Sequence, residues 1–118
     1  MIFHITPRAD WEAAQTKGEY VAESLKSESF IHCSTLAQVV PVADKYYKGQ
    51  NGLVLLMIEP TLLSSTLKWE DPSGGAPPPG VPEGDMFPHI YGPINLDAVV
   101  NVFDFIRDPN GDWSMPSV

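Results

Sequence analysis

Apolar and polar positions alternate along three short stretches of the chain, as they do in strands with one buried face. These stretches are IFHIT at residues 2–6, SFIHC at residues 29–33 and FPHIY at residues 87–91. A fourth stretch, GLVLLMI at residues 52–58, is apolar throughout, which is typical of a central strand covered on both faces. With weaker extended patterns in TLKWE and towards the C-terminus, the sequence predicts five or six strands, most of them in its second half.

The first of two expected helices follows the N-terminal strand. Thr6 and Pro7 fit an N-cap followed by a proline in the first turn, where the missing amide proton has no hydrogen bond to lose. Lys17 and Gly18 fit a helix end, because a basic residue and then a glycine commonly close a helix.

The second expected helix follows the strand at residues 29–33. Thr35 and Gln38 fit a capping box, in which each side chain bonds the backbone amide of the other residue. Apolar residues then recur at helical spacing as far as Tyr47, and Gly49 fits the end. Pro41 lies inside this pattern, so we expect either a kink or a later start of the helix.

A long irregular loop is expected at residues 71–88, which hold six prolines and four glycines. Loops of this length are usually binding loops, lids or disordered segments, and a lid is the interpretation favoured here. Two early helices and mostly later strands predict a single α+β domain over residues 1–108. Residues 109–118 are expected to form a mobile tail, apart from Trp113.

The charge of the chain argues against nucleic acid as a partner. The net charge is −8, from 15 acidic and 7 basic residues, and Arg8 and Arg107 are the only arginines. Binding to a polyanion requires clustered lysine and arginine, and the overall field of this chain repels phosphates. A small anion still has local options, because backbone amides and histidines bind anions without a basic patch.

The remaining composition predicts a cytoplasmic protein with no membrane partner. No apolar run approaches the roughly 18–20 residues that span a bilayer. The N-terminal sequence MIFHITPRADW has no basic start followed by an apolar segment, so we expect no secretory signal. The single cysteine excludes an internal disulfide and fits a reducing compartment.

All three histidines lie in the alternating stretches, which makes these stretches candidates for chemistry. Strand alternation puts His32 on one face with Phe30 and Ser34, and puts His89 on one face with Tyr91. If the strands pair, the imidazoles of His4, His32 and His89 line one cleft, with the long loop beside it. Imidazoles offer directional hydrogen bonds and both protonation states near neutral pH.

Other side chains near these histidines suit a polar, partly aromatic ligand. Ser34 and Thr35 precede a helix start, where free amides favour an anion or a ribose-phosphate oxygen. Tyr91 and Trp69 offer rings for stacking. Glu70 is a candidate general base or ribose ligand, or a solvated charge at a turn.

Plainer interpretations compete with each of these roles. A histidine at a strand end often only bonds a neighbouring carbonyl, since buried polar groups need partners. Cys33 fits a small core residue better than a nucleophile, because its own face offers no base. A zinc set of His4, His32, His89 and Glu70 has suitable ligand types, but the chain has none of the short ligand spacings of known zinc motifs.

The order of motifs resembles a bacterial family, the domain of unknown function 952. The resemblance runs over residues 2–106 and rests on IFHIT, SFIHCST, VLLMIE, LKWE and FPHIYGPI, of which FIHCST and FPHIYGPI are the most specific. It implies a fold similar to that of the ADP-ribosyltransferases, a split β-sandwich with two helices in its N-terminal half. The family itself implies no established activity.

In ADP-ribosyltransferase-like proteins, a histidine of the first strand bonds a ribose hydroxyl of NAD, and the resemblance implies that role for His4. It places Ser34 and Thr35 at the hydroxyls after the second strand. The glutamate that stabilises the oxocarbenium ion has no assigned counterpart; Glu70 is the nearest in sequence, and His89 is the alternative. Loss of such a carboxylate removes several kcal/mol of transition-state stabilisation, so binding without transfer is an option.

Three functions therefore remain open from the sequence. The first is a small-molecule site for NAD, ADP-ribose or a related ligand, with candidate catalytic and binding residues His4, His32, Ser34, Thr35, Trp69, Glu70, His89 and Tyr91. The second is a non-catalytic binding or interaction module in which the histidines only stabilise the fold. The third is a small metal-dependent enzyme.

Overall fold

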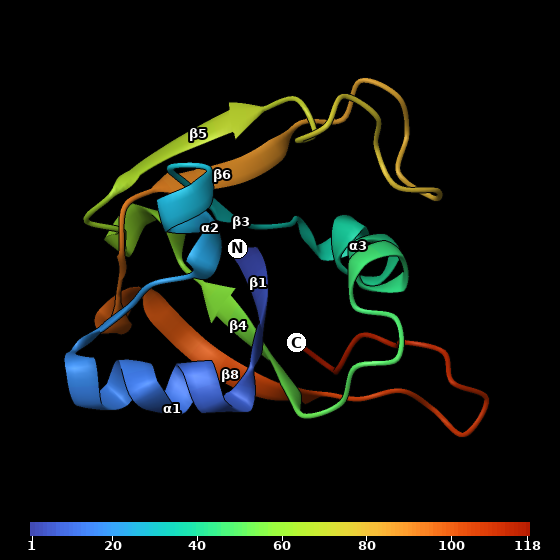
Figure 1. Ribbon diagram of the computed structural model, residues 1–118, viewed down its shortest axis with the longest axis horizontal. Helices are drawn as coiled ribbons and strands as arrows, with labels where there is room; N and C mark the ends of the chain where they lie inside the picture. Colours follow the sequence, from blue (N-terminus) through green and yellow to red (C-terminus); the bar gives the residue numbers. More distant parts are fainter.

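Eight strands and three α-helices make up the computed structural model, which describes residues 1–118 (Figure 1). The helices are α1 (Arg8–Lys17), α2 (Glu23–Ser27) and α3 (Val39–Tyr46). The strands are β1 (Ile2–Pro7), β2 (Glu19–Tyr20), β3 (Ile31–His32), β4 (Leu53–Ile58), β5 (Thr66–Glu70), β6 (Phe87–Tyr91), β7 (Ile94–Asn95) and β8 (Val99–Phe105). The α+β class predicted from the sequence is confirmed, and no helix has the length and apolar character needed to cross a membrane.

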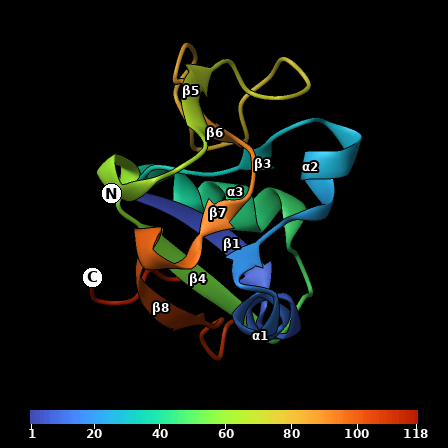
Figure 2. The ribbon, with the colours of Figure 1, turned by 90° about the vertical axis from the view of Figure 1, so that its left-hand side faces the viewer.

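The strands form three small antiparallel sheets. β1, β4 and β8 form the first in the order β1-β4-β8, β2 and β7 form a two-stranded ribbon, and the third has the order β3-β6-β5. In Figures 1 and 2, β5 and β6 lie above the β1-β4-β8 sheet, and α1 lies at the bottom of the view, at the level of β8. A backbone bridge between Phe3 and Ser34 joins the first and third sheets, so β1 and the segment after β3 meet beside the candidate site.

Alternation along β1 divides its side chains between two hydrophobic cores, so both faces of the strand are buried rather than the one that the sequence predicted. Ile2 belongs to a core built with α1 and the third sheet, whereas Phe3 and Ile5 belong to a core built with α3 and β8. β4 is central in its sheet and contributes to both cores, so its continuous apolar sequence is explained by cover on both faces.

The predicted N-cap at Thr6 is wrong. β1 continues through Pro7, which is itself the N-cap of α1, and the Thr6 hydroxyl hydrogen-bonds Tyr20 inside the core at 2.8 Å. The buried Tyr20 hydroxyl needs a hydrogen-bond partner, so the Thr6 side chain bonds Tyr20 instead of capping α1. The predicted helix end is confirmed: Lys17 is the last residue, and Gly18 adopts a left-handed conformation with φ of 91°.

The capping box at Thr35 and Gln38 is confirmed. It opens a 3₁₀ turn, η1 (Leu36–Gln38), and α3 begins only at Val39. Pro41 therefore lies in the first turn of α3, where a proline removes no helical hydrogen bond, and the predicted later start is the outcome observed. Two further 3₁₀ turns, η2 (Pro60–Leu62) and η3 (Leu96–Ala98), precede β5 and β8.

The segment between β2 and β3 was not predicted. It contains α2, which buries none of its residues and so carries no apolar periodicity. Ser29 follows with φ of 73°, a rare conformation for a residue other than glycine. This turn shortens the expected strand at residues 29–33 to Ile31–His32 and positions Glu28 beside His32.

The predicted irregular loop over residues 71–88 forms but ends two residues earlier, because β6 begins at Phe87. Several contacts tie this loop to the domain. Near its start, Ser73 donates a hydrogen bond to Glu28 at 3.0 Å. In its middle, Val81 is buried. Near its end, the buried Gln38 side chain donates to the Met86 carbonyl at 2.9 Å. The loop extends above α3 at the right of Figure 1.

The C-terminal tail has one firm anchor. Trp113 is buried and stacks on Phe105 of β8, with ring centroids 4.8 Å apart and planes inclined by 5°. Arg107 forms a backbone bridge with Trp113. The exception made for Trp113 in the sequence analysis thus agrees with its packing.

Candidate functional site

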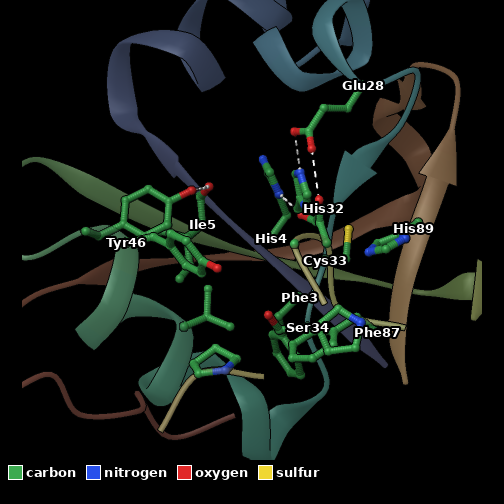
Figure 3. A pocket seen from close by; sticks show the side chains of 16 residues that line it. Phe3, His4, Ile5, Glu28, His32, Cys33, Ser34, Tyr46, Phe87 and His89 are labelled. Atoms are coloured by element: carbon green, nitrogen blue, oxygen red, sulfur yellow. Dashed lines mark hydrogen bonds and ion pairs between the residues drawn. The ribbon is translucent and has the colours of Figure 1, made fainter. Parts of the chain in front are cut away.

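A cavity of about 480 Å³ lies where β1, β3, β6, α3 and the long loop meet (Figure 3). Its volume is within the range typical of small-molecule sites. His4, His32 and His89 all contribute to its lining, so segments far apart in the sequence bring the three imidazoles to one place. They differ sharply in how their ring nitrogens are used.

His32 is held by a carboxylate from the turn that precedes β3. Its Nε2 lies 2.7 Å from Glu28 Oε2, and the other oxygen of Glu28 accepts the hydrogen bond from Ser73 of the loop. The hydrogen bond from His32 holds the pKa of Glu28 below its usual range. With Nε2 donating to Glu28, Nδ1 is left as the free nitrogen of His32.

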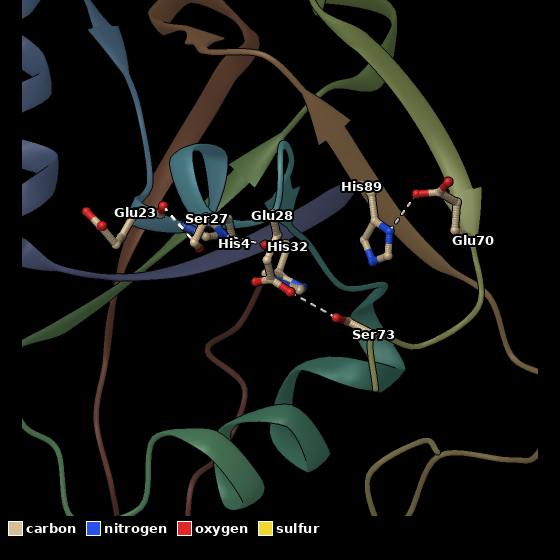
Figure 4. A network of polar contacts seen from close by, with 8 residues as sticks. All are labelled: His4, Glu23, Ser27, Glu28, His32, Glu70, Ser73 and His89. Carbon is tan, nitrogen blue, oxygen red and sulfur yellow. Dashed lines mark hydrogen bonds and ion pairs between the residues drawn. The ribbon is translucent and has the colours of Figure 1, made fainter. Parts of the chain in front are cut away.

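His89 is held by a second carboxylate on the neighbouring strand β5. Its Nδ1 lies 2.8 Å from Glu70 Oε1 (Figure 4). The Tyr91 hydroxyl donates to the same oxygen at 2.5 Å. These hydrogen bonds, first from Tyr91 and then from His89, hold the pKa of Glu70 below its usual range. A carboxylate only accepts, so Nδ1 of His89 carries the proton.

The second nitrogen of His89, Nε2, faces open space. It has no hydrogen-bond partner in the protein, yet the chain contains no buried side-chain nitrogen or oxygen without a partner. Nε2 therefore reaches the surface of the cavity, although His89 as a whole is only 3% exposed. A carboxylate-oriented imidazole with a free nitrogen in a cavity is suited to accept a proton or a hydrogen bond from a ligand.

The two imidazoles form an aromatic cluster with Phe30. The rings of His32 and His89 are 5.5 Å apart at their centroids and nearly perpendicular, at 79°. Phe30 stacks on His89 at 4.1 Å and contacts His32 edge-on at 4.8 Å. This packing fixes the orientation of both rings beside the cavity.

His4 lies beneath this cluster with both nitrogens occupied. Nδ1 lies 2.5 Å from the His32 carbonyl, and Nε2 lies 2.8 Å from the Tyr20 hydroxyl, which in turn bonds Thr6. Burial lowers the pKa of His4 to about 4, so the ring is neutral at pH 7. In this arrangement His4 has no free nitrogen for a ribose hydroxyl, and it supports the backbone of His32 instead.

At the anion site expected at the start of the second helix, the backbone amides of Thr35 and Gln38 are already hydrogen-bonded. The Thr35 amide donates to Gln38 Oε1 at 3.0 Å, and the Gln38 amide bonds back to Thr35, so the capping box uses groups that were expected to be free. Ser34 does line the cavity, whereas Thr35 does not. Trp69 also lies outside the lining, with 48% of its surface exposed.

The two remaining chemical alternatives gain no support from the geometry. Cys33 is 3% exposed, and burial raises the pKa of its thiol well above the usual range, which disfavours a thiolate nucleophile. No group of three or more His, Cys, Asp or Glu side chains is arranged to hold a metal ion. The zinc set considered from the sequence therefore does not assemble.

Two polar partners of the site were missed in the sequence analysis. Glu28 and Ser73 line the cavity, but they lie in segments without a periodic pattern. The four-residue spacing between Glu28 and His32 was the available signal, and it carries weight only inside a helix. Aromatic surface comes from Tyr46 at the end of α3, from Tyr47 at its C-cap and from Phe87.

Comparisons with known proteins find relatives over nearly the whole chain. The family model described as protein of unknown function (DUF952) matches residues 5–102. The crystal structure of protein CC0527 from Caulobacter crescentus is 33% identical, has a TM-score of 0.79, and the match covers 96% of this chain and 92% of that one. Its solution NMR structure is 35% identical, with a TM-score of 0.74 and coverage of 94% and 89%. No curated protein matches.

Proposed function

The chain belongs to the DUF952 family, and from its site we propose a domain that binds a small nucleotide-like molecule of the NAD or ADP-ribose type between β1, β3 and β6. The proposal includes similarity to the ADP-ribosyltransferase fold. Two features support that similarity: the antiparallel sheets split around one cavity, and the histidine strand β1 is followed, after α1, β2 and α2, by the second histidine strand β3.

The observation that carries the proposal is the pair of fixed imidazoles. His32 and His89 each have one nitrogen held by a glutamate and the other free, with ring centroids 5.5 Å apart. A ribose presents neighbouring hydroxyls that donate and accept hydrogen bonds, which suits two neighbouring imidazoles that each keep one nitrogen free. Phe3 and Phe87 add apolar faces for a planar base.

The role proposed for each residue follows from its placement. His32, Ser34 and His89 contact the ligand, Glu28 and Glu70 orient the two imidazoles, and Tyr91 orients Glu70. His4 supports the carbonyl of His32 from below. The long loop acts as a lid through the bond between Ser73 and Glu28.

The test is a titration of ¹⁵N-labelled protein with NAD and with ADP-ribose, followed by NMR. We expect the amides of His32, Ser34 and His89 to shift in a saturable manner. His89→Gln should weaken binding about tenfold through loss of a well-placed hydrogen bond. Trp69→Ala, on the same sheet but outside the cavity, is the matched control and should bind normally. An unchanged spectrum at millimolar ligand would refute the proposal.

One observation favours a second candidate, an interaction module with structural histidines. His4 is satisfied entirely within the protein, while Trp69 and Met86 expose large apolar surfaces at 48% and 45%. On this alternative, replacing His89 lowers stability and changes no ligand response. The same titration therefore distinguishes the two candidates.

A further inference from the structure

β5 is an edge strand whose outer side has no partner in the fold. Its sheet has the order β3-β6-β5, and β5 is the uppermost strand in Figure 1. Unpaired backbone groups along such an edge form a ready template for another strand, and proteins usually protect them. On β8, an edge strand of the first sheet, the Asn101 side chain bonds the Val102 amide at 2.9 Å. The nearest comparable bond to β5 is at Ser64, before the strand begins.

The backbone groups of Trp69 point towards this open edge. Cys33 donates its amide to the Pro88 carbonyl at 3.0 Å, so the carbonyl of Pro88 points from β6 towards β3. Pro88 is paired with Trp69 of β5. In an antiparallel ladder the N–H and C=O of one residue point to the same side, and hydrogen-bonded pairs alternate with pairs that exchange no bonds. The N–H and C=O of Trp69, and of Leu67 two residues earlier, are therefore available to a further strand.

The side chains of β5 divide into an apolar face and a charged face. Leu67 packs on the core shared with α1, and Trp69 lies on the same face of the strand with 48% of its surface exposed. Lys68 and Glu70 lie on the opposite face, where Lys68 lies over the ring of Tyr91 at 4.8 Å and Glu70 accepts the hydrogen bond from the Tyr91 hydroxyl. A half-exposed tryptophan beside an open strand edge is typical of a contact surface, because aromatic residues are enriched in interfaces.

Charge selects one register for pairing between two copies of β5. A twofold axis puts residues of the same face opposite each other. With Trp69 opposite Trp69 of a second copy, Lys68 of each copy lies opposite Glu70 of the other, and the two indole rings meet on the apolar face. With Lys68 on the axis, the two ammonium groups are opposed, and with Leu67 on the axis neither charge has a partner. Opposite charges across a strand pair are favourable, so the register centred on Trp69 is preferred.

We propose that this edge binds a second copy of the chain, in an antiparallel pairing of β5 with β5 that has Trp69 at the twofold axis. The β3-β6-β5 sheets of the two copies then form one continuous sheet. Lys68 of the second copy lies opposite Glu70, the carboxylate that orients His89, so the interface reaches a residue that supports the cavity. Pairing at this edge is independent of what the cavity binds.

The dimer is expected to be weak. The strand has five residues, and the net charge of −8 repels a second copy at long range. The measurement is therefore sedimentation velocity at about 0.15 M salt, where this repulsion is screened beyond roughly 8 Å. Between roughly 10 µM and 1 mM protein, the weight-average sedimentation coefficient should rise from that of a monomer towards that of a dimer. A monomer throughout this range would overturn the proposal.

A dilution series followed by ¹⁵N NMR locates the contact. The amides of Leu67 and Trp69 should shift with protein concentration, because they gain hydrogen-bond partners in the dimer. The Val102 amide, on the protected edge of the other sheet, is the reference and should stay in place. Concentration-dependent shifts confined to β8 would show that the copies meet elsewhere and would overturn the proposal.

A charge swap tests the register. Lys68→Glu puts two glutamates opposite each other at each pair, and Glu70→Lys puts two lysines there, so either variant alone should self-associate about tenfold more weakly. An equimolar mixture of the two variants restores both opposite-charge pairs and should recover association at the unmodified level. A mixture as weak as its components overturns the register. If Glu70→Lys does not fold, Lys68→Glu carries the test alone, and unchanged or tighter self-association overturns it.

The apolar part of the interface has a matched control. Trp69→Ala removes the ring at the axis and should weaken self-association about tenfold. Leu62→Ala changes an equally exposed apolar residue, at 49%, that lies in η2 outside the strand and should leave self-association unchanged. Equal effects of the two substitutions would overturn the position of Trp69 at the axis.

Discussion

Two regions of the molecule use the same residue type in opposite ways. In the core beneath the cavity, His4 bonds the His32 carbonyl and the Tyr20 hydroxyl and keeps no free nitrogen. At the wall of the cavity, His32 and His89 each bond one glutamate and keep one nitrogen free. The difference separates a histidine that stabilises the fold from histidines that are available to a ligand.

The position of each strand explains the difference. β1 pairs with β4 and meets Ser34 through a backbone bridge, and the buried His4 ring at the base of the cavity has both nitrogens bonded within the protein. β6 pairs with β5 and β3, and His89 faces the cavity that these strands leave beside α3. The same imidazole is therefore structural in one sheet and accessible in the other.

The largest effect is expected from His4→Ala. The substitution leaves a void in the core and removes the partner of two buried groups, the Tyr20 hydroxyl and the His32 carbonyl, so the free energy of unfolding should fall by about 3–5 kcal/mol. His32→Ala, with a side chain that is 42% exposed, is the comparison variant and should cost less than about 1 kcal/mol. Urea denaturation measures both, and equal losses would remove the distinction between the two regions.

The next largest effect is expected from pH, again through His4. Burial lowers the pKa of His4 from 6.5 to about 4. Between these pH values, His4 is protonated in the unfolded chain and neutral in the folded chain. Stability is therefore complete above pH 6.5 and is lost as the pH falls towards 4. Between pH 6.5 and pH 5 the loss from His4 should be about 2 kcal/mol.

The carboxylates of Glu28 and Glu70 do not titrate in this pH range, so they do not contribute to the loss. The pKa values of Glu28 and Glu70 are lowered from 4.5, chiefly by hydrogen bonds from His32 and Tyr91 respectively, so their contributions disappear only near and below pH 4.5. Urea denaturation across the range gives the loss in stability, and ¹⁵N shifts of the His4 ring report its protonation. A His4 ring that protonates near pH 6.5 in the folded protein would contradict the assignment.

The sequence predicted the parts of the fold that depend on periodicity. Alternation along IFHIT gave the two faces of β1, and the continuous apolar run gave the central position of β4. Pro41 indicated either a kink or a later helix start, and the later start is observed, because proline geometry is a local constraint. These features depend on burial and backbone geometry, which a single sequence displays directly.

The sequence could not predict the assignment of hydrogen bonds within the site. Nothing near His4 in the chain indicates that Tyr20 and the His32 carbonyl would occupy its nitrogens, because both contacts are made across the fold. Glu28 was missed for a related reason: its placement depends on a turn with positive φ at Ser29, a residue type that rarely adopts this conformation. Tertiary contacts and an unusual backbone conformation therefore decided which histidines are free.

A smaller, local effect is expected from Glu70→Ala. The carboxylate accepts from Nδ1 of His89 and so fixes the tautomer in which Nε2 is the free nitrogen. Without it, the neutral ring should populate both tautomers, and the ring ¹⁵N shifts of His89 should move towards intermediate values. The His4 shifts are the internal reference and should stay in place, because its partners are unaffected. A single unchanged tautomer of His89 would show that Phe30 packing alone orients the ring.

The smallest effect is expected from Ser73→Ala, which removes the hydrogen bond between the loop and Glu28. Both partners lie at the surface, so the free energy of unfolding should change by no more than about 0.5 kcal/mol. Amide exchange should nevertheless accelerate at residues 72–75, while residues near Met86, held by Gln38, keep their protection. Glu28 retains its bond to His32, so loss of the bond to Ser73 should cost much less stability than loss of the His4 side chain from the core. A loss of stability comparable to that of His4→Ala would instead make the loop contact part of the folding core.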